Sequence, residues 1–170
     1  MTASDQPLTH DERLMVLGRI AQSAALMETI LRSLVASLIG SPRAVIVVSG
    51  QSVSWLIETA LAIVKHNDEA RAPTLGPPRH VAAFATAIQR CKDANKRRND
   101  ALHGAWIDDD QQIVSKYRQP YMMMLLQPAV DLTRLSNDLD EVVMELLDTS
   151  MKVTGVLWRP NQTAEDSADQ

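Results

Sequence analysis

Apolar residues recur at alternating steps of three and four along the first forty positions, from Leu14 to Leu38. This stripe predicts a long amphipathic helix, with Asp11 as its N-terminal cap and Gly40-Ser41-Pro42 at its end. Glu28 lies in the same stripe, where a core residue is expected. Because a buried carboxylate must be paired or neutral, Glu28 needs a partner, a pocket or a position nearer the surface.

The next part of the chain, from position 42 to position 78, predicts a short element, a second helix and a loop. Pro42 is suited to a helix start, but Val45-Ile46-Val47-Val48 is β-branched enough for a strand. A short helix is favoured for residues 42–48, and a strand remains the alternative. A second helix is predicted from about Ser52 to Lys65, and the sequence HNDEARAPTLGPP at 66–78 has the composition of a loop.

The third helix is predicted to begin near Arg79 and to close at Gly104 in a left-handed cap. Its apolar stripe contains Val81, Phe84, Ile88 and Cys91, and the same steps continue through Asn95, Arg98 and Leu102. Residues 106–107 and 113–117, on either side of the acidic turn 108–110, predict a β-hairpin, with residues 121–126 as a candidate extension. Pro128 is expected to open the last helix, whose broad apolar face runs to about Val153.

Together these elements predict an all-α fold, an antiparallel four-helix bundle with a small β-hairpin between helices three and four. We expect a flexible N-terminus at residues 1–10, a helical domain at 11–158 and a disordered tail at 159–170. The tail is rich in polar and acidic residues and too poor in apolar ones to order itself.

Composition agrees with packed helices, since 45% of the residues are hydrophobic and only 4% are aromatic. The single cysteine, Cys91, excludes an internal disulfide and a cysteine-rich zinc site. His10, His66 and His80 lack metal-ligand spacing, so neither a metal nor a cofactor is expected. The polar N-terminus has no signal-peptide pattern, and apolar runs such as 44–48 are too short to cross a bilayer, so we expect a soluble cytoplasmic protein.

The net charge of −4 means that any nucleic-acid contact must be local. The end of the third helix provides a local positive bias. From Arg90 to His103, two aspartates oppose five basic residues, which are Arg90, Lys92, Lys96, Arg97 and Arg98. Such an arrangement suits a focused phosphate contact, with Lys92 and Lys96 as candidate RNA-binding residues.

The same helix ends in Arg98-Asn99-Asp100-Ala101-Leu102-His103. On an ideal helix, residues five apart differ by about 140° around the axis, so Arg98 and His103 do not share a face. Asn99 and His103 follow Lys92 and Lys96 along one polar stripe, and the long side chain of Arg98 can reach toward it.

This Arg-polar-x-x-x-His run at the end of a bundle helix resembles the signature of HEPN domains. The resemblance implies a helical bundle, usually dimeric, that in many members cleaves RNA without metal by attack of a ribose 2′-hydroxyl on the adjacent phosphate. Arg98 would then steady the phosphate charge, His103 would move the proton and Asn99 would orient the site. It also implies a toxin or phage-defence role, with an antitoxin protein as a possible partner.

Physical chemistry fits these roles, because imidazole titrates near neutrality with an ordinary pKa of about 6.5, and guanidinium grips two phosphoryl oxygens. Because Arg98 and His103 of the same chain lie on different faces of the helix, we expect a composite site that two subunits of a homodimer form together. Glu28 and Glu58 are candidates to orient Arg98. Two alternatives stay open: a HEPN-like dimerisation or RNA-binding module without chemistry, and a plain helical interaction protein. In the latter, Arg98 pairs with a carboxylate and His103 caps the helix end.

Overall fold

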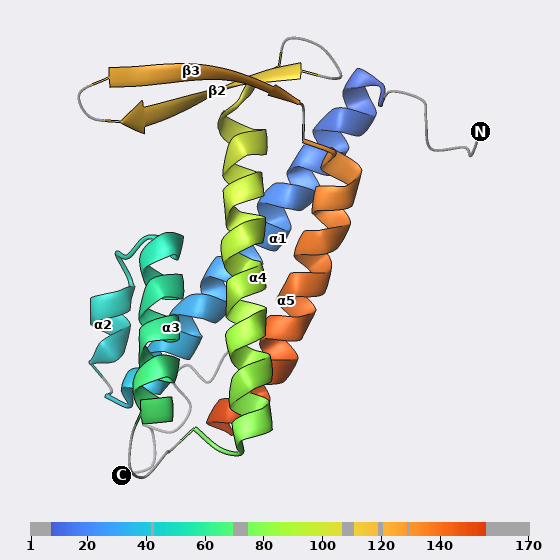
Figure 1. Ribbon diagram of the computed structural model, residues 1–170. Coiled ribbons are helices and arrows are strands. Elements are labelled where there is room, and N and C mark those ends of the chain that lie inside the picture. The colour runs from blue at the N-terminus through green and yellow to red at the C-terminus, as the bar shows by residue number, and fades with distance from the viewer. Residues whose placement is uncertain are drawn as a thin grey trace, which may run out of the picture.

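The computed structural model describes residues 8–41, 43–69, 75–106, 111–118, 121–128 and 130–155. Helices dominate these residues, as Figure 1 shows, so the predicted all-α class is confirmed. The elements are α1 (His10–Ile39), α2 (Ala44–Val48), α3 (Val53–Glu69), α4 (Pro78–His103), β1 (Ala105–Trp106), β2 (Gln111–Arg118), β3 (Tyr121–Pro128) and α5 (Leu132–Thr154).

The four longer helices surround one core. Helix α5 packs along both α1 and α4, and α3 packs against the same two helices from the other side. Helices α1 and α4 contact each other less. Figure 1 shows α4 and α5 side by side, with their chains running in opposite directions. The largest side chains with under 2% exposure include Phe84, Ile20, Met27, Leu31, Leu56, Ile57, Ile88, Leu135, Leu139 and Leu146.

The ends of α1 are set by local hydrogen bonds. Thr9, not Asp11, is the N-cap: the Glu12 N–H donates to the Thr9 hydroxyl, and the Thr9 N–H donates to the Glu12 carboxylate. The expectation of an Asp11 cap was therefore wrong, because a capping box satisfies two free backbone donors where a lone aspartate satisfies one. At the other end, Gly40 adopts φ 69° and its N–H donates to Ala36, so the predicted end at Gly40 is confirmed.

The ambiguous segment forms the short helix α2, as favoured from the sequence. Ala44 and Val48 are buried against α1, whereas Val45, Ile46 and Val47 are 61%, 77% and 54% exposed. A strand buried on both faces would have covered all five apolar side chains of residues 44–48, whereas the helix buries only two of them. Pro42 lies outside the described residues.

Helix α4 ends where a small sheet begins, at the top of the bundle in Figure 1. Strand β2 pairs antiparallel with both β1 and β3, giving the order β1-β2-β3. The acidic turn 108–110 lies outside the described residues. The last helix begins at Leu132 with an Asp131 cap, so the expected start at Pro128 was wrong: Pro128 ends β3, opposite Gln111.

Gly104 does not have the left-handed conformation expected from the sequence. Its φ of −76° and ψ of 140° are extended. A Cβ at this position would lie 2.6 Å from the Asp100 carbonyl oxygen and 2.9 Å from Oε1 of Gln112. The glycine therefore serves a close approach between the helix end and β2, rather than a backbone conformation that other residues avoid.

Helix α1 is long and apolar enough to cross a membrane by length and composition alone. A core helix meets the same criterion, and α1 buries seven residues, between Ile20 and Val35, in the bundle. Of the expected flexible N-terminus (1–10), only residues 8–10 are described. Of the chain after α5, which includes the expected disordered tail (159–170), only residue 155 is described.

Candidate functional site

The residues of the Arg-polar-x-x-x-His motif lie in the last two turns of α4, next to the sheet. Arg98 and Asn99 are half-buried, whereas His103 is exposed as the last residue of the helix. Among the described residues, no hydrogen bond joins Arg98 to His103 within one chain, as their separation around the helix axis requires.

Asn99 holds the Arg98 guanidinium. Nη1 of Arg98 donates to Oδ1 of Asn99 over 2.8 Å. Because Asn99 lies on the polar stripe with Lys96 and His103, this bond draws the guanidinium from the inward side of α4 toward that stripe. The contact is of the kind expected if Asn99 orients the site.

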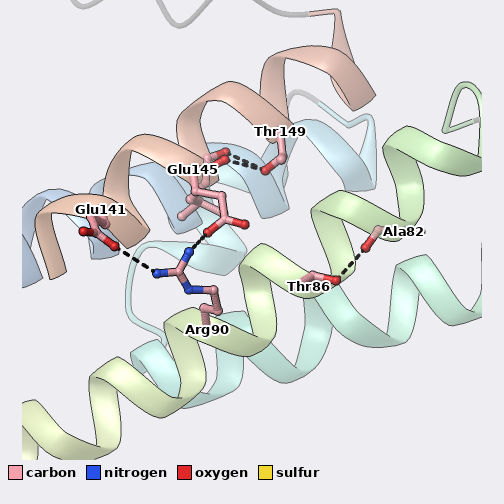
Figure 2. A network of polar contacts seen from close by, with 7 residues as sticks. Ala82, Thr86, Arg90, Glu141, Glu145 and Thr149 are labelled. Atoms are coloured by element: carbon pink, nitrogen blue, oxygen red, sulfur yellow. Dashed lines mark hydrogen bonds and ion pairs between the residues drawn. The ribbon is translucent and has the colours of Figure 1, made fainter. Parts of the chain in front are cut away.

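Most of the positive bias near the end of α4 is neutralised by acidic residues of other helices. Lys92 pairs with Glu58 over 2.6 Å, and Arg97 pairs with Asp138 over 2.8 Å. Figure 2 shows Arg90 reaching from α4 between two glutamates of α5, Glu141 and Glu145, both of which it pairs with. Of the five cations, only Lys96 and Arg98 have no ion pair with another described residue. The set of candidate RNA-binding residues on α4 is therefore reduced to Lys96, Arg98 and His103.

The two carboxylates considered as orienting groups have other partners. Glu28 is half-buried and pairs with Arg32, one turn further along α1. Glu58 is exposed and pairs with Lys92. The position of Glu28 in an apolar stripe thus reflects an ion pair at the edge of the core, where solvent still reaches the carboxylate.

The remaining reactive groups do not extend the site. Cys91 is fully buried, and burial, helped by the charge of Glu145, raises the pKa of its thiol to about 12. It is therefore a neutral core residue and not a nucleophile. No group of three or more His, Cys, Asp or Glu within the described ranges could hold a metal ion. A hollow between α1 and α5, lined by Leu34, Leu147 and Ser150, lies at the other end of the bundle.

Buried polar residues near the motif were missed by sequence reasoning. Asn95 and Ser136 are only 6% and 2% exposed, and Gln112 of β2 is fully buried against Gly104. Asn95 had a signal, because it interrupts the apolar stripe of α4 one turn before Arg98. Ser136 and Gln112 had none, since a lone serine or glutamine in an amphipathic pattern is ordinarily a surface residue.

The chain matches no protein-family model, no curated protein and no solved structure. The functional interpretation therefore depends on the geometry of α4 and on the chemistry of its residues.

Proposed function

We propose that the chain is a metal-independent endoribonuclease of HEPN type that acts as a homodimer in the cytoplasm. The observation that carries the proposal is the bond from Arg98 to Asn99, which places the guanidinium beside the stripe that bears Lys96 and His103. The arrangement of α1, α3, α4 and α5 around one core supports a four-helix, HEPN-like bundle, with the sheet inserted between α4 and α5.

The reaction needs no group from outside the protein and the RNA. The ribose 2′-hydroxyl attacks the adjacent phosphorus while one imidazole accepts its proton, and the bond from phosphorus to the 5′-oxygen breaks. An imidazolium protonates that leaving oxygen, so the products are a 2′,3′-cyclic phosphate and a 5′-hydroxyl. Arg98 would hold two phosphoryl oxygens as negative charge builds on the pentacoordinate phosphorus.

A two-fold axis beside the end of α4 would supply what a single chain does not. One exposed His103 from each subunit would flank the phosphate, so that one acts as the base and the other as the acid. Mixing Arg98→Ala subunits with His103→Ala subunits, each severely impaired alone, tests this composite site. The mixed dimer carries one Arg98 and one His103, so it lacks either the base or the acid, and we expect it to cleave far more slowly than the wild-type protein. A fully active mixed dimer would argue against two imidazoles acting on one phosphate.

The distribution of ion pairs gives a sharper test of RNA binding. Lys96 and Lys92 lie one turn apart on the polar stripe, but Lys92 is paired with Glu58 and Lys96 has no acidic partner among the described residues. Lys96→Ala should weaken RNA binding and lower its salt dependence, because an unpaired cation displaces counterions from the phosphate backbone. Lys92→Ala is the matched control and should change binding much less. Equal effects of the two substitutions would contradict a focused contact at the end of α4.

The biological role we propose is that of a toxin or phage-defence component, which an antitoxin protein would restrain. Expression of the wild-type chain should then slow cell growth, and His103→Ala should relieve the effect. A harmless wild-type chain with ribonuclease activity in vitro would separate the chemistry from this role.

A second candidate is a HEPN-like dimerisation or RNA-binding module without catalysis. It is favoured by the ion pairs that neutralise Arg90, Lys92 and Arg97, which leave few charges for a substrate. RNA binding that survives His103→Ala but is lost in Arg98→Ala, with no cleavage by either protein, would support the binding module instead.

A further inference from the structure

Five buried polar atoms without hydrogen-bond partners among the described residues lie near the motif. Two of them belong to Gln112 on β2, and the other three are Oδ1 of Asn95, Nε of Arg98 and Oγ of Ser136. Asn95 and Ser136 are 6% and 2% exposed. A buried polar atom without a partner is costly, and folded proteins keep few of them, so their presence beside a candidate site calls for a role.

The three residues belong to one level of the bundle. Asn95 precedes Arg98 by three residues, so their side chains are neighbours on the same side of α4. A long side chain on a helix leans toward the N-terminus, which takes Arg98 over Asn95. Ser136 lies two residues before Asp138 on α5. The ion pair between Arg97 and Asp138, over 2.8 Å, joins this part of α5 to the part of α4 that carries Asn95 and Arg98.

The chemistry of the three atoms is complementary. Nε of Arg98 carries one N–H and can only donate, whereas Oδ1 of Asn95 can only accept. The hydroxyl of Ser136 can donate to the second lone pair of the same oxygen. A guanidinium whose Nε reached Oδ1 of Asn95 would therefore pair two atoms that otherwise remain without partners.

We propose that Asn95 is a positioning residue for Arg98, accepting the Nε hydrogen bond when the guanidinium engages a phosphate. This inference rests on the proposed function. Asn99 holds Nη1 on one side and Asn95 holds Nε on the other. Three N–H groups then remain free, both on Nη2 and one on Nη1, and they form the fork that binds two phosphoryl oxygens. The two asparagines, one turn apart, fix the plane of that fork.

A measurement independent of catalysis tests the contact. The Nε–H resonance of Arg98, assigned by its loss in Arg98→Lys, is followed by NMR while a non-cleavable 2′-O-methyl RNA is added. In the wild-type protein we expect a downfield shift and slower exchange with water on binding. Asn95→Leu removes the acceptor at nearly constant volume and should abolish both changes, whereas Asn95→Asp keeps an acceptor and should retain them.

Cleavage kinetics provide the second readout. We expect Asn95→Leu to lower kcat/KM by roughly 10- to 100-fold, as does the loss of a hydrogen bond to a charged group. In an Arg98→Ala background the same substitution should have no further effect, because Asn95 acts through the arginine. Asn95→Asp should stay within a few-fold of the wild-type protein.

Asn67 provides a matched control, since it is also a buried asparagine and accepts a hydrogen bond from the Leu75 N–H over 3.1 Å at the other end of the bundle. Asn67→Leu should leave the Arg98 resonance and the cleavage rate unchanged. An Nε resonance that responds to RNA equally in the wild-type protein and in Asn95→Leu would overturn the inference. Additive effects of Asn95→Leu and Arg98→Ala on the cleavage rate would also overturn it, as would a folded but inactive Asn95→Asp. Absence of cleavage by the wild-type protein would instead overturn the proposed function, and the NMR measurement would still decide the contact.

Discussion

Replacing Gly104 with alanine should destabilise the protein, although its backbone conformation suits any residue. The added Cβ would lie 2.6 Å from the Asp100 carbonyl oxygen, which is backbone, and 2.9 Å from Oε1 of Gln112. Gln112 is fully buried, so it has little room to move away. The Asp100 oxygen already accepts the Gly104 N–H over 3.0 Å, so relieving the clash also disturbs this bond.

The expected magnitude follows from two opposing effects. Overpacking of one methyl group into a closed site costs about 1–3 kcal/mol. Loss of glycine's freedom in the unfolded chain offsets this by about 0.4–1 kcal/mol, because φ of −76° is accessible to alanine. A net loss of about 1–2 kcal/mol corresponds to a fall in Tm of about 2–8 °C for a chain of this size.

Gly18→Ala is the matched control, because nothing lies within 4 Å of a Cβ at this exposed position inside α1. Alanine in a helix interior is favoured over glycine by about 0.5–1 kcal/mol, so this variant should be more stable than the wild-type protein. Urea and thermal unfolding of the two variants should therefore shift in opposite directions. Stabilisation by both substitutions would refute the close approach of the α4 end to β2.

Further predictions concern the core, the buried thiol and the start of α1. Phe84→Ala should lower the free energy of unfolding by about 3–5 kcal/mol in urea, since the side chain is fully buried in the hydrophobic core, and a loss below 1 kcal/mol would place it at the surface. The Cys91 thiol, whose pKa is raised to about 12, should stay neutral and unmodified by iodoacetamide at pH 8 until urea unfolds the chain; rapid labelling of the folded protein would contradict its burial. Thr9→Ala should cost about 1 kcal/mol. Hydrogen bonds from Thr9 hold the pKa of Glu12 below its ordinary value, so the carboxylate stabilises the helix start above that value and loses its effect as the pH falls through the lowered pKa. The protection of the first amides of α1, taken relative to the intrinsic exchange rate at each pH, should therefore fall in acid. Unchanged protection would argue against the capping box.

The sequence predicted those parts of the fold that depend on periodicity. The apolar stripes located α1, α3, α4 and the body of α5, because burial on one side of a helix requires that spacing. It failed at ends that depend on specific hydrogen bonds, as at Thr9, and at Pro128, which suits a helix start as well as a strand end. Gly104 was located as the end of α4, but the reason for it is a contact with Gln112, which lies on another element.

The site was predicted in part. The motif residues could be named, and the separation of Arg98 from His103 follows from helix geometry alone. Ion pairing could not be foreseen, because Glu58, Asp138, Glu141 and Glu145 come from distant parts of the chain. Net charge within one helix therefore overestimated the charge available to a substrate.

The role of His103 is tested most directly by cleavage of single-stranded RNA in the presence of a chelator. The wild-type protein should produce 2′,3′-cyclic phosphate ends, leave a 2′-O-methyl RNA intact, and lose at least about 100-fold in rate in His103→Ala. The free energy of unfolding of this variant should lie within about 1 kcal/mol of that of the wild-type protein, since the side chain is exposed at a helix end. Cleavage by folded His103→Ala at the wild-type rate, or cleavage of the 2′-O-methyl RNA, would contradict the account.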